Sequence, residues 1–524
     1  MAIKVITLLE KLESPFGPSC DRAKETRVNT EKNLGPYESL RDYLDALQAR
    51  GHVVHIAEVD QDAYEATGLI YRLIESCGWT GAPVLIFDRV KVDGRWITGP
   101  LVANLYGRWE YDALAIGCDP AGRSARETFR MALDRITGLA GKDGQWKTVA
   151  PRIIPAADAP CKEIVQIGEA VDILDFPFIQ SNPADGGRYI NTGNVVLQHP
   201  TYGRNVGTYR CQIKGPRKIA VNPLPNQHGW TFLTDLKDRG EAVAKAAVVL
   251  GADPIVFAMS SSKTARLGQD ELALAGGFLG KSVEVVKCQT SDILVPAHAE
   301  MIIEGEIPFD LEPEGPFGEM FGYVGPGIPE NFYMNITAVT CRRNPIIVNH
   351  FSGVTRGFLT SPLEATINLK FKQQFTHLVA IHLPLATPGF CFVSIDKNAP
   401  GDGLRVGRKI SKDVMLAKIT IVVDKDVDIY DPAEVMRTVG ARWQPHPASE
   451  IIKKARGSST DPSLAERGVT SKIVIDATRQ LPHEGGPEHY AIHNKDALLE
   501  GQPDIFARVD EKWSTLVEQL KHKA

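Results

Sequence analysis

The 524-residue chain lacks the features that would place it on a membrane, on nucleic acid or in a disulfide scaffold. Its eight cysteines are scattered without a CxxC pair, which excludes a zinc knuckle and a dithiol redox motif. No apolar run approaches the length of a transmembrane helix, and the N-terminus lacks a secretion signal. A net charge of −5 does not indicate the excess of positive charge that is typical of nucleic-acid-binding proteins. We therefore expect free thiols and a cytoplasmic protein that binds neither membrane nor nucleic acid.

The composition is that of a globular protein, with 43% hydrophobic and 23% charged residues. Apolar residues recur at helical spacing from Tyr37 to Ala49, and the alternating stretch HVVHIAEV follows. Together with the buried strand APVLIFD, this alternation predicts an N-terminal α/β domain over residues 1–150. A stretch rich in proline and alanine at residues 150–163 marks its end.

Residues 151–352 have a different sequence pattern, in which glycine, proline and asparagine interrupt short apolar runs. This pattern predicts a central β domain of the barrel or sandwich type. We expect a pair of helices to interrupt it, at about residues 236–249 and 270–278.

A linking helix is predicted within residues 353–385. Ser361 suits the N-cap, Pro362 the first helical position, and Glu364 would complete a capping box. Residues 386–524, which contain the apolar stretch ITIVV, are predicted to form a C-terminal α/β domain.

Two motifs imitate known binding loops. The stretch AGGFLGKS, which contains Lys281, matches a relaxed phosphate-loop pattern, but helical residues precede it and strand-like residues follow, so we interpret it as a surface turn. Asp424, Asp426 and Asp428 resemble the start of a calcium loop that has Ile429 in place of the required glycine. We interpret them as solvated acids at a strand end.

The stretch EGPFGE carries two carboxylates, Glu314 and Glu319, five positions apart. In a helix or a strand this spacing would point the two side chains in different directions. The proline and two glycines between them instead predict a bend. A bend can bring both acids to one point.

Further polar residues occupy the central block, and each of them alone is most simply explained as a turn, loop or surface residue. They are Asn205, Arg210, Gln227, His228, Ser261, Ser262 and Glu271. Together with EMIIEGEIPFDLEPEGPFGEMFGYVGPG (300–327) and VVKC (285–288), they make the chain resemble the UbiD-like decarboxylases, which use prenylated FMN. The resemblance extends from about Leu40 to residue 478.

The resemblance implies an α/β protein of three parts: an N-terminal α/β domain, a split β-barrel that binds the cofactor, and a C-terminal α/β domain that forms oligomers, reached through the linking helix. It implies a role for Arg210, Glu314 and Glu319 as the acid–base group. Raised proton affinity in a buried acid pair suits proton donation. Asn205, His228 and Glu271 match the ligands of a Mn²⁺ or Mg²⁺ ion that holds the cofactor phosphate.

Other matches complete the implied site. Gln227, Ser262 and Lys412 match positions near the cofactor, and Ser261 and Arg442 match positions around a K⁺ ion. A flavin prenyltransferase would supply the cofactor, and the chain would be a homo-oligomer. Residues 1–38 precede the start of shorter family members, and we assign them no function.

The implied reaction is the reversible non-oxidative decarboxylation of an aromatic or α,β-unsaturated acid through a covalent adduct with prenylated FMN. The adduct provides the electron sink that side chains lack. Hydroxybenzoates, cinnamates, fused-ring acids and aryl-CoA thioesters such as phthaloyl-CoA all remain candidate substrates. Two alternatives are the catalytic subunit of a multi-subunit aryl carboxylase, and a nucleotide hydrolase using Lys281. Carbon dioxide release by the purified single chain tests the first alternative, and ATP hydrolysis tests the second.

Overall fold

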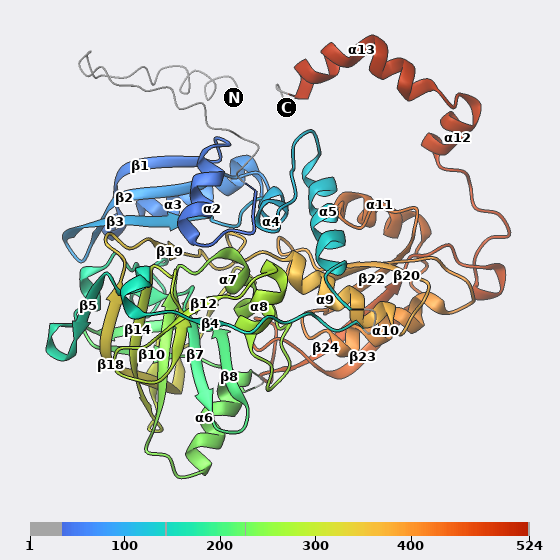
Figure 1. Cartoon of the computed structure of the whole chain (residues 1–524). Coiled ribbons are helices and arrows are strands. Elements are labelled where there is room, and N and C mark those ends of the chain that lie inside the picture. The colour runs from blue at the N-terminus through green and yellow to red at the C-terminus, as the bar shows by residue number, and fades with distance from the viewer. Residues whose placement is uncertain (1–33, 142–143, 226, 522–524) are drawn as a thin grey trace, which may run out of the picture. The chain divides into compact units, whose positions relative to one another are not determined.

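The computed structural model describes residues 34–141, 144–225 and 227–521, and its three largest sheets correspond to the three expected parts (Figure 1). The start of the chain, including Cys20 and most of the extension, lies outside the described residues. The other seven cysteines are free thiols. No helix in the described ranges is both long and apolar enough to cross a bilayer.

The N-terminal part is a four-stranded sheet with helices packed against it, as the helix and strand patterns predicted. Its last strand comes from much later in the chain and pairs parallel with β3, which ties the N-terminal part to the central one. The strands, in sheet order, are β1 (Val53–Asp60), β2 (Val84–Val92), β3 (Arg95–Ala103) and β19 (Ile347–Asn349). The helices are α2 (Leu40–Gln48), α3 (Glu65–Cys77), α4 (Glu110–Ala115) and α5 (Ala125–Thr137).

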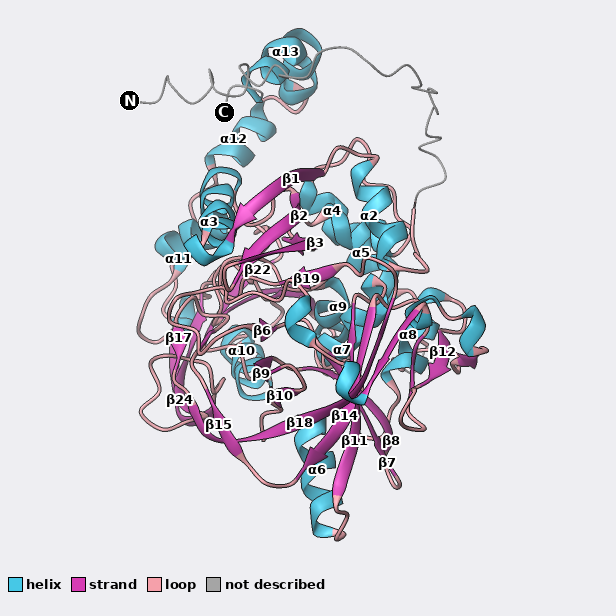
Figure 2. Ribbon diagram, turned by 90° about the vertical axis from the view of Figure 1, so that its left-hand side faces the viewer, coloured by secondary structure: helices cyan, strands magenta, loops and turns pink. Residues whose placement is uncertain are grey.

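The central part is a ten-stranded, largely antiparallel sheet, which confirms the predicted β domain. Its main path runs β6 (Tyr189–Ile190), β9 (Cys211–Gly215), β10 (Lys218–Val221), β18 (Ile328–Cys341), β14 (Met301–Pro308), β11 (Val243–Leu250), β7 (Asn194–His199) and β8 (Gly203–Thr208). Two further strands, β5 (Ile164–Ile167) and β15 (Glu312–Glu314), pair with β18. The long strand β18 therefore pairs with four others. Figure 2 labels three of these partners, β10, β14 and β15.

Three helices and two small sheets accompany this large sheet. The helices are α6 (His228–Asp238), α7 (Pro254–Ser261) and α8 (Glu271–Leu279). The small sheets consist of β13 (Leu294–Pro296), β12 (Glu284–Lys287) and β4 (Arg152–Ile153), and of β16 (Phe317–Gly318) and β17 (Val324–Gly325).

One predicted helix in this part is wrong. Residues 236–249 contain the end of α6 and most of strand β11, whereas the second predicted helix, at 270–278, is α8. The alanines around residues 244–247 favour a helix intrinsically. Here β11 is buried between β7 and β14, and its sheet hydrogen bonds and packing override that preference.

The C-terminal part is a five-stranded sheet with helices, which confirms the predicted α/β domain. Its strands, in order, are β20 (Leu378–His382), β21 (Phe390–Ile395), β22 (Ile419–Asp424), β24 (Val469–Asp476) and β23 (Ser449–Arg456). Its helices are α10 (Asp402–Asp413), α11 (Pro432–Arg442), α12 (Asn494–Gly501) and α13 (Ile505–Lys521).

The linking helix α9 (Ser361–Lys372) is present, but its predicted N-cap is wrong. The N-cap is Thr360, and its side chain makes no capping hydrogen bond. The Ser361 amide instead donates to Asp112 Oδ1 at 2.9 Å. Glu364 receives hydrogen bonds from the segment 382–383 and is not available for a capping box. Hydrogen bonds to residues distant in the sequence therefore stabilise the start of α9 in place of local capping side chains.

The buried N-cap of α7 makes the stability of the chain depend on pH. Asp253 accepts hydrogen bonds from the amides of Ile255 and Val256, at 3.0 and 3.1 Å. Burial raises its pKa to about 6, well above the usual value near ~3.9 for an unfolded chain. The native state therefore holds this proton more tightly. The resulting stability is complete below about pH 4 and is lost as the pH rises through 6.

We expect Asp253→Asn to raise the melting temperature at pH 8. Asparagine caps a helix about as well as aspartate but carries no charge to bury. At pH 4.5 the difference between variant and wild type should shrink, which calorimetry at both pH values would measure. A variant that is less stable than wild type at pH 8 would contradict this account.

Candidate active site

The structure brings together the three residues that were predicted to act as the acid–base group. Arg210 immediately precedes β9, Glu314 ends β15, and Glu319 follows β16. Arg210 donates from Nε and Nη2 to the two carboxylate oxygens of Glu314, at 2.8 and 3.2 Å. Its Nη1 donates to Glu319. One guanidinium therefore holds both acids, in the forked geometry that suits carboxylates.

The predicted bend in EGPFGE is present, between the short strands β15 and β16. A second loop clamps it through backbone contacts. The Gly186 amide donates to the Pro316 carbonyl at 2.8 Å. The side-chain amide of Gln212 bridges the two loops, because it donates to the Gly186 carbonyl at 2.7 Å and accepts from the Gly315 amide at 2.9 Å.

Asp185 completes this clamp. Its Oδ1 accepts from the Gly318 amide at 2.9 Å, and its Oδ2 accepts from the Asn182 amide at the same distance. The sequence analysis missed Asp185 and Gln212, which lie more than 100 residues from the bend. The run Asp-Gly-Gly at 185–187 is the only local signal, and it indicates a turn without naming what the turn contacts.

The two acids have different surroundings. Glu314 is fully buried and also accepts a hydrogen bond from Asn331 Nδ2 at 3.0 Å. Glu319 keeps 18% of its side-chain surface exposed, so it can face a substrate. Burial raises the pKa of Glu319, Arg210 opposes the rise, and Glu314 adds to it. A carboxyl group with a raised pKa is suited to give up a proton near neutral pH.

An aromatic layer supports the guanidinium. The centre of the Phe317 ring lies 5.2 Å from Arg210 Cζ, and the ring packs on Tyr189 at a centroid distance of 4.5 Å. The Tyr189 hydroxyl donates to the Gly315 and Pro316 carbonyls, at 3.0 and 3.1 Å. Phe317 thus fixes the position of Arg210 from one side.

We expect Gly315→Ala to disrupt the site and Gly318→Ala to leave it nearly intact. A Cβ atom on Gly315 would lie 2.6 Å from Gly186 Cα, so one backbone must move. The nearest atom to a Cβ on Gly318 is Asp185 Oδ1, at 3.9 Å. Overpacking typically costs about 1–3 kcal/mol. Melting temperature and turnover should both fall for the first variant, and equal behaviour of the two variants would contradict the clamp.

The three predicted metal ligands lie on three neighbouring segments. Asn205 is on β8, His228 begins α6, and Glu271 begins α8. His228 Nδ1 lies 3.9 Å from Glu271 Oε1, and Glu271 Oε2 accepts from the Val206 amide at 2.8 Å. Burial raises the pKa of Glu271, and His228 opposes the rise.

The donor set fits a divalent cation. An imidazole, a carboxylate and an amide oxygen suit a borderline or hard ion. The Asn205 Nδ2 atom is buried without a hydrogen-bond partner in the described chain. Because amide oxygen and nitrogen are assigned from their partners, a half-turn of this amide would put Oδ1, a metal ligand, in that position. Among the described residues no three His, Cys, Asp or Glu side chains are grouped as metal ligands, and the role of Asn205 as third donor stays a prediction.

The predicted cofactor-binding residues divide into two groups. Gln227 directly precedes His228 at the start of α6, and Ser261 and Ser262 lie at the end of α7. The Ser261 hydroxyl lies 2.8 Å from that of Thr208 on β8. Lys412 is exposed on α10, and no contact within the described chain joins it to the other predicted site residues. Its assignment stays a prediction.

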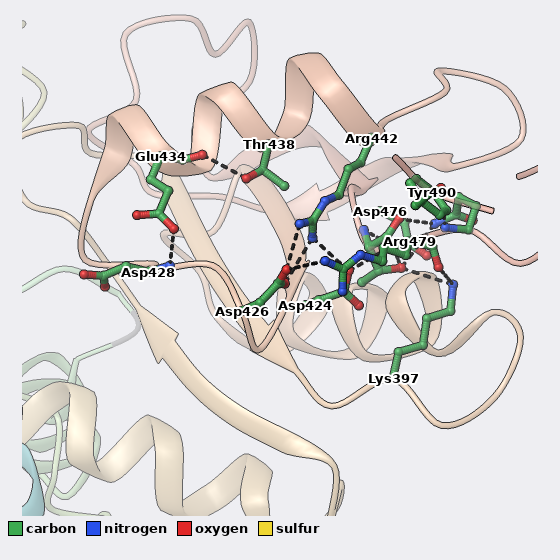
Figure 3. Close-up of polar contacts among 12 residues, drawn as sticks. Lys397, Asp424, Asp426, Asp428, Glu434, Thr438, Arg442, Asp476, Arg479 and Tyr490 are labelled. Atoms are coloured by element: carbon green, nitrogen blue, oxygen red, sulfur yellow. Dashed lines mark hydrogen bonds and ion pairs between the residues drawn. The ribbon is translucent and has the colours of Figure 1, made fainter. Parts of the chain in front are cut away.

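Arg442, which was predicted to lie near a K⁺ ion, contacts two aspartates in the structure (Figure 3). It donates to Asp424 at 3.1 Å and makes a two-pronged contact with Asp426, at 3.1 and 2.8 Å. Arg479 also binds Asp426. No contact among the described residues joins Arg442 to Ser261.

The interpretation of the aspartates at the end of β22 as solvated acids is wrong. Asp424 is 9% exposed and Asp426 shares two arginines, while Asp428 pairs with Arg126 and Arg130. These acids are paired rather than simply solvated. The interpretation of AGGFLGKS as a turn agrees with the fold: Lys281 follows the C-terminus of α8 and pairs with Glu38. A phosphate loop would lie at the start of a helix, which disfavours the nucleotide hydrolase.

Three family models match successive parts of the chain. They are the N-terminal, Rift-related and C-terminal domains of 3-octaprenyl-4-hydroxybenzoate carboxy-lyase (UbiD), at residues 44–128, 152–355 and 358–477. The UbiD-class enzyme HmfF from Pelotomaculum thermopropionicum, solved in complex with FMN, is 31% identical. That alignment covers 88% of this chain and 98% of HmfF, with a TM-score of 0.73.

The chain belongs to the UbiD family. This is a family of carboxy-lyases. The three-part α/β architecture expected from the resemblance is the UbiD architecture.

Other UbiD relatives agree over nearly the whole length. The vanillic acid decarboxylase of Sedimentibacter hydroxybenzoicus, in closed form, is 26% identical over 92% of this chain and 99% of that chain, with a TM-score of 0.75. The uncharacterized protein sll0936 of Synechocystis sp. is 28% identical over 494 residues, which are 91% of this chain and 95% of the relative.

Proposed function

We propose that this UbiD protein catalyses the reversible non-oxidative decarboxylation of an aromatic or α,β-unsaturated carboxylic acid with prenylated FMN. The observation that carries the proposal is the assembly of Arg210, Glu314 and Glu319, with the less buried acid bearing a raised pKa. An evolved dimeric form of HmfF has been solved with prenylated FMN, and the Sedimentibacter relative is named for decarboxylation of an aromatic acid.

The cofactor would supply the electron sink for loss of carbon dioxide from an sp² carbon, which amino-acid side chains cannot provide. In this proposal Asn205, His228 and Glu271 hold Mn²⁺ or Mg²⁺ against its phosphate, and Ser261 contributes to a K⁺ site. Arg210 orients the substrate carboxylate and Glu319. Glu319 delivers the proton that replaces the carboxyl group, while Glu314 fixes the arginine from the buried side.

The test is release of carbon dioxide by the purified single chain loaded with prenylated FMN, against a panel of benzoic, cinnamic, fused-ring and aryl-CoA acids. Turnover by the single chain supports the proposal. A chain that binds the cofactor but turns over only with added subunits would favour the alternative of an aryl carboxylase subunit. A chain that takes up no flavin at all would contradict both.

The oligomeric state belongs to the same proposal. We expect a homo-oligomer assembled through the C-terminal α/β domain. An evolved dimeric form of the UbiD relative HmfF supports the expectation of more than one chain. Light scattering at micromolar concentration should report a mass of at least twice 57.4 kDa. A species of 57.4 kDa alone would contradict this expectation.

A further inference from the structure

A cavity of about 240 Å³ lies between the N-terminal part, the linking helix and the C-terminal part. Its walls include Trp79 and Trp109 from the N-terminal part and Leu383 and Tyr430 from the C-terminal part. None of the residues that line it belongs to the Arg210 group or to the predicted metal ligands. Domain junctions are a common place for small-molecule sites.

A buried pair of side chains faces this cavity. His382, at the end of β20, places Nδ1 at 2.9 and 3.1 Å from the two carboxylate oxygens of Glu364 on α9. Both residues are almost fully buried, at 3% and 2% exposed. The Leu383 amide also donates to Glu364, at 3.3 Å.

The pair leaves one ring nitrogen without a partner. A carboxylate can only accept, so Nδ1 carries the hydrogen, and in the neutral ring Nε2 is then a hydrogen-bond acceptor. Within the described ranges no group hydrogen-bonds to His382 Nε2. A ligand that enters the cavity and donates an O–H would complete this chain of hydrogen bonds.

The pair is not needed merely to hold α9 against β20. Asn368 on α9 already does so, because its Nδ2 donates to the Ile381 carbonyl at 2.9 Å and its Oδ1 accepts from the Ile381 amide at 2.8 Å. His382 Nε2 therefore takes no part in the hydrogen bonds that join α9 to β20.

The walls favour a flat ligand. The rings of His382 and Tyr430 lie 4.7 Å apart between centroids, and Trp109 meets His382 edge to face at 5.9 Å. A dry cavity of about 150 Å³ in another protein holds benzene, so 240 Å³ has room for one substituted ring.

The charges at the walls favour an uncharged ligand. The cavity's two arginines are already paired, Arg356 with Asp112 and Arg126 with Asp431. Neither is available to neutralise an anion.

We propose that this cavity binds a small uncharged phenol, whose ring packs against the aromatic side chains and whose hydroxyl donates to His382 Nε2. The site is separate from the proposed catalytic centre and does not depend on the proposed reaction. A phenol held here would bridge the N-terminal part and the C-terminal part of the chain.

The test uses phenol and toluene as probes, titrated into the full-length protein at pH 8 and followed by calorimetry and tryptophan fluorescence. Toluene has the same ring without the hydroxyl. Phenol should bind roughly 3- to 10-fold more tightly than toluene, the effect of one net hydrogen bond. Equal affinities would overturn the proposal.

Two substitutions locate the binding. His382→Asn can place an amide N–H near the position of Nδ1 for Glu364, but its shorter side chain has no acceptor at the position of Nε2, so it should abolish the preference for phenol over toluene. Ala386→Trp, at the exposed rim of the cavity, should weaken both probes. Glu319→Gln serves as the matched control and should change neither affinity. A preference for phenol that persists in His382→Asn, an unchanged phenol affinity in Ala386→Trp, or a loss of affinity in Glu319→Gln would place the binding elsewhere and overturn the proposal.

Discussion

Replacing Glu319 with glutamine is expected to reduce turnover by about 10²- to 10⁴-fold while the protein keeps its fold and its cofactor. Glutamine preserves the size of the side chain and an oxygen that Arg210 Nη1 can donate to, but it has no proton to transfer. Positioned acid–base groups contribute about this factor. Incorporation of deuterium from heavy water into the product should fall in parallel, because it uses the same proton.

The matched control for Glu319→Gln is Glu312→Gln. Glu312 lies on the same short strand as Glu314 but pairs with Lys214 and Lys218, away from Arg210. Its substitution should leave turnover within a few-fold of wild type. If Glu319→Gln instead lowers the melting temperature and turns over normally per folded molecule, Glu319 only stabilises the bend and its catalytic assignment falls.

Replacing Glu271 with alanine is expected to remove the metal ion and the flavin together. The carboxylate is the only anionic donor in the proposed set, and the ion would be the counter-charge of the cofactor phosphate. Changes in residues that only support metal ligands cost about 10- to 100-fold in affinity, so loss of a direct ligand should cost at least that much. Metal analysis and the flavin absorbance of the purified variant measure both losses.

Glu271→Gln separates charge from structure in this experiment. Glutamine retains an oxygen for the Val206 amide, so β8 should stay in place. If the charge is what matters, this variant also loses metal and flavin, and its melting temperature should equal that of wild-type protein stripped of both. Full flavin occupancy in metal-free Glu271→Ala protein would show that the cofactor phosphate is held by other groups.

The sequence was most informative where a local pattern and a function coincide. The residues between Glu314 and Glu319 predict a bend from their backbone preferences alone, and the structure shows that bend bringing both acids to Arg210. The order of strands and helices at both ends of the chain was also readable, because amphipathic spacing reflects burial directly.

The sequence was least informative where residues far apart in the chain determine the local structure. The alanine-rich β11 has a helical preference that its sheet neighbours override, and the end of α9 is set by Asp112, 249 positions earlier in the chain. Asp185 and Gln212 hold the bend through main-chain groups, which leave no pattern in the sequence of the bend itself. The cavity beside His382 likewise forms only when three parts of the chain meet.

The position of β18 has a consequence for how the active site forms during folding. The Arg210 contacts with Glu314 and Glu319 span 104 and 109 positions. Glu314 is placed by the pairing of β15 with β18, and Glu319 follows five positions later, after β16. Contacts between such distant positions form slowly, because a long loop must close first. In refolding, helix signals should therefore recover before activity does, and the delay should be set by assembly of the large sheet.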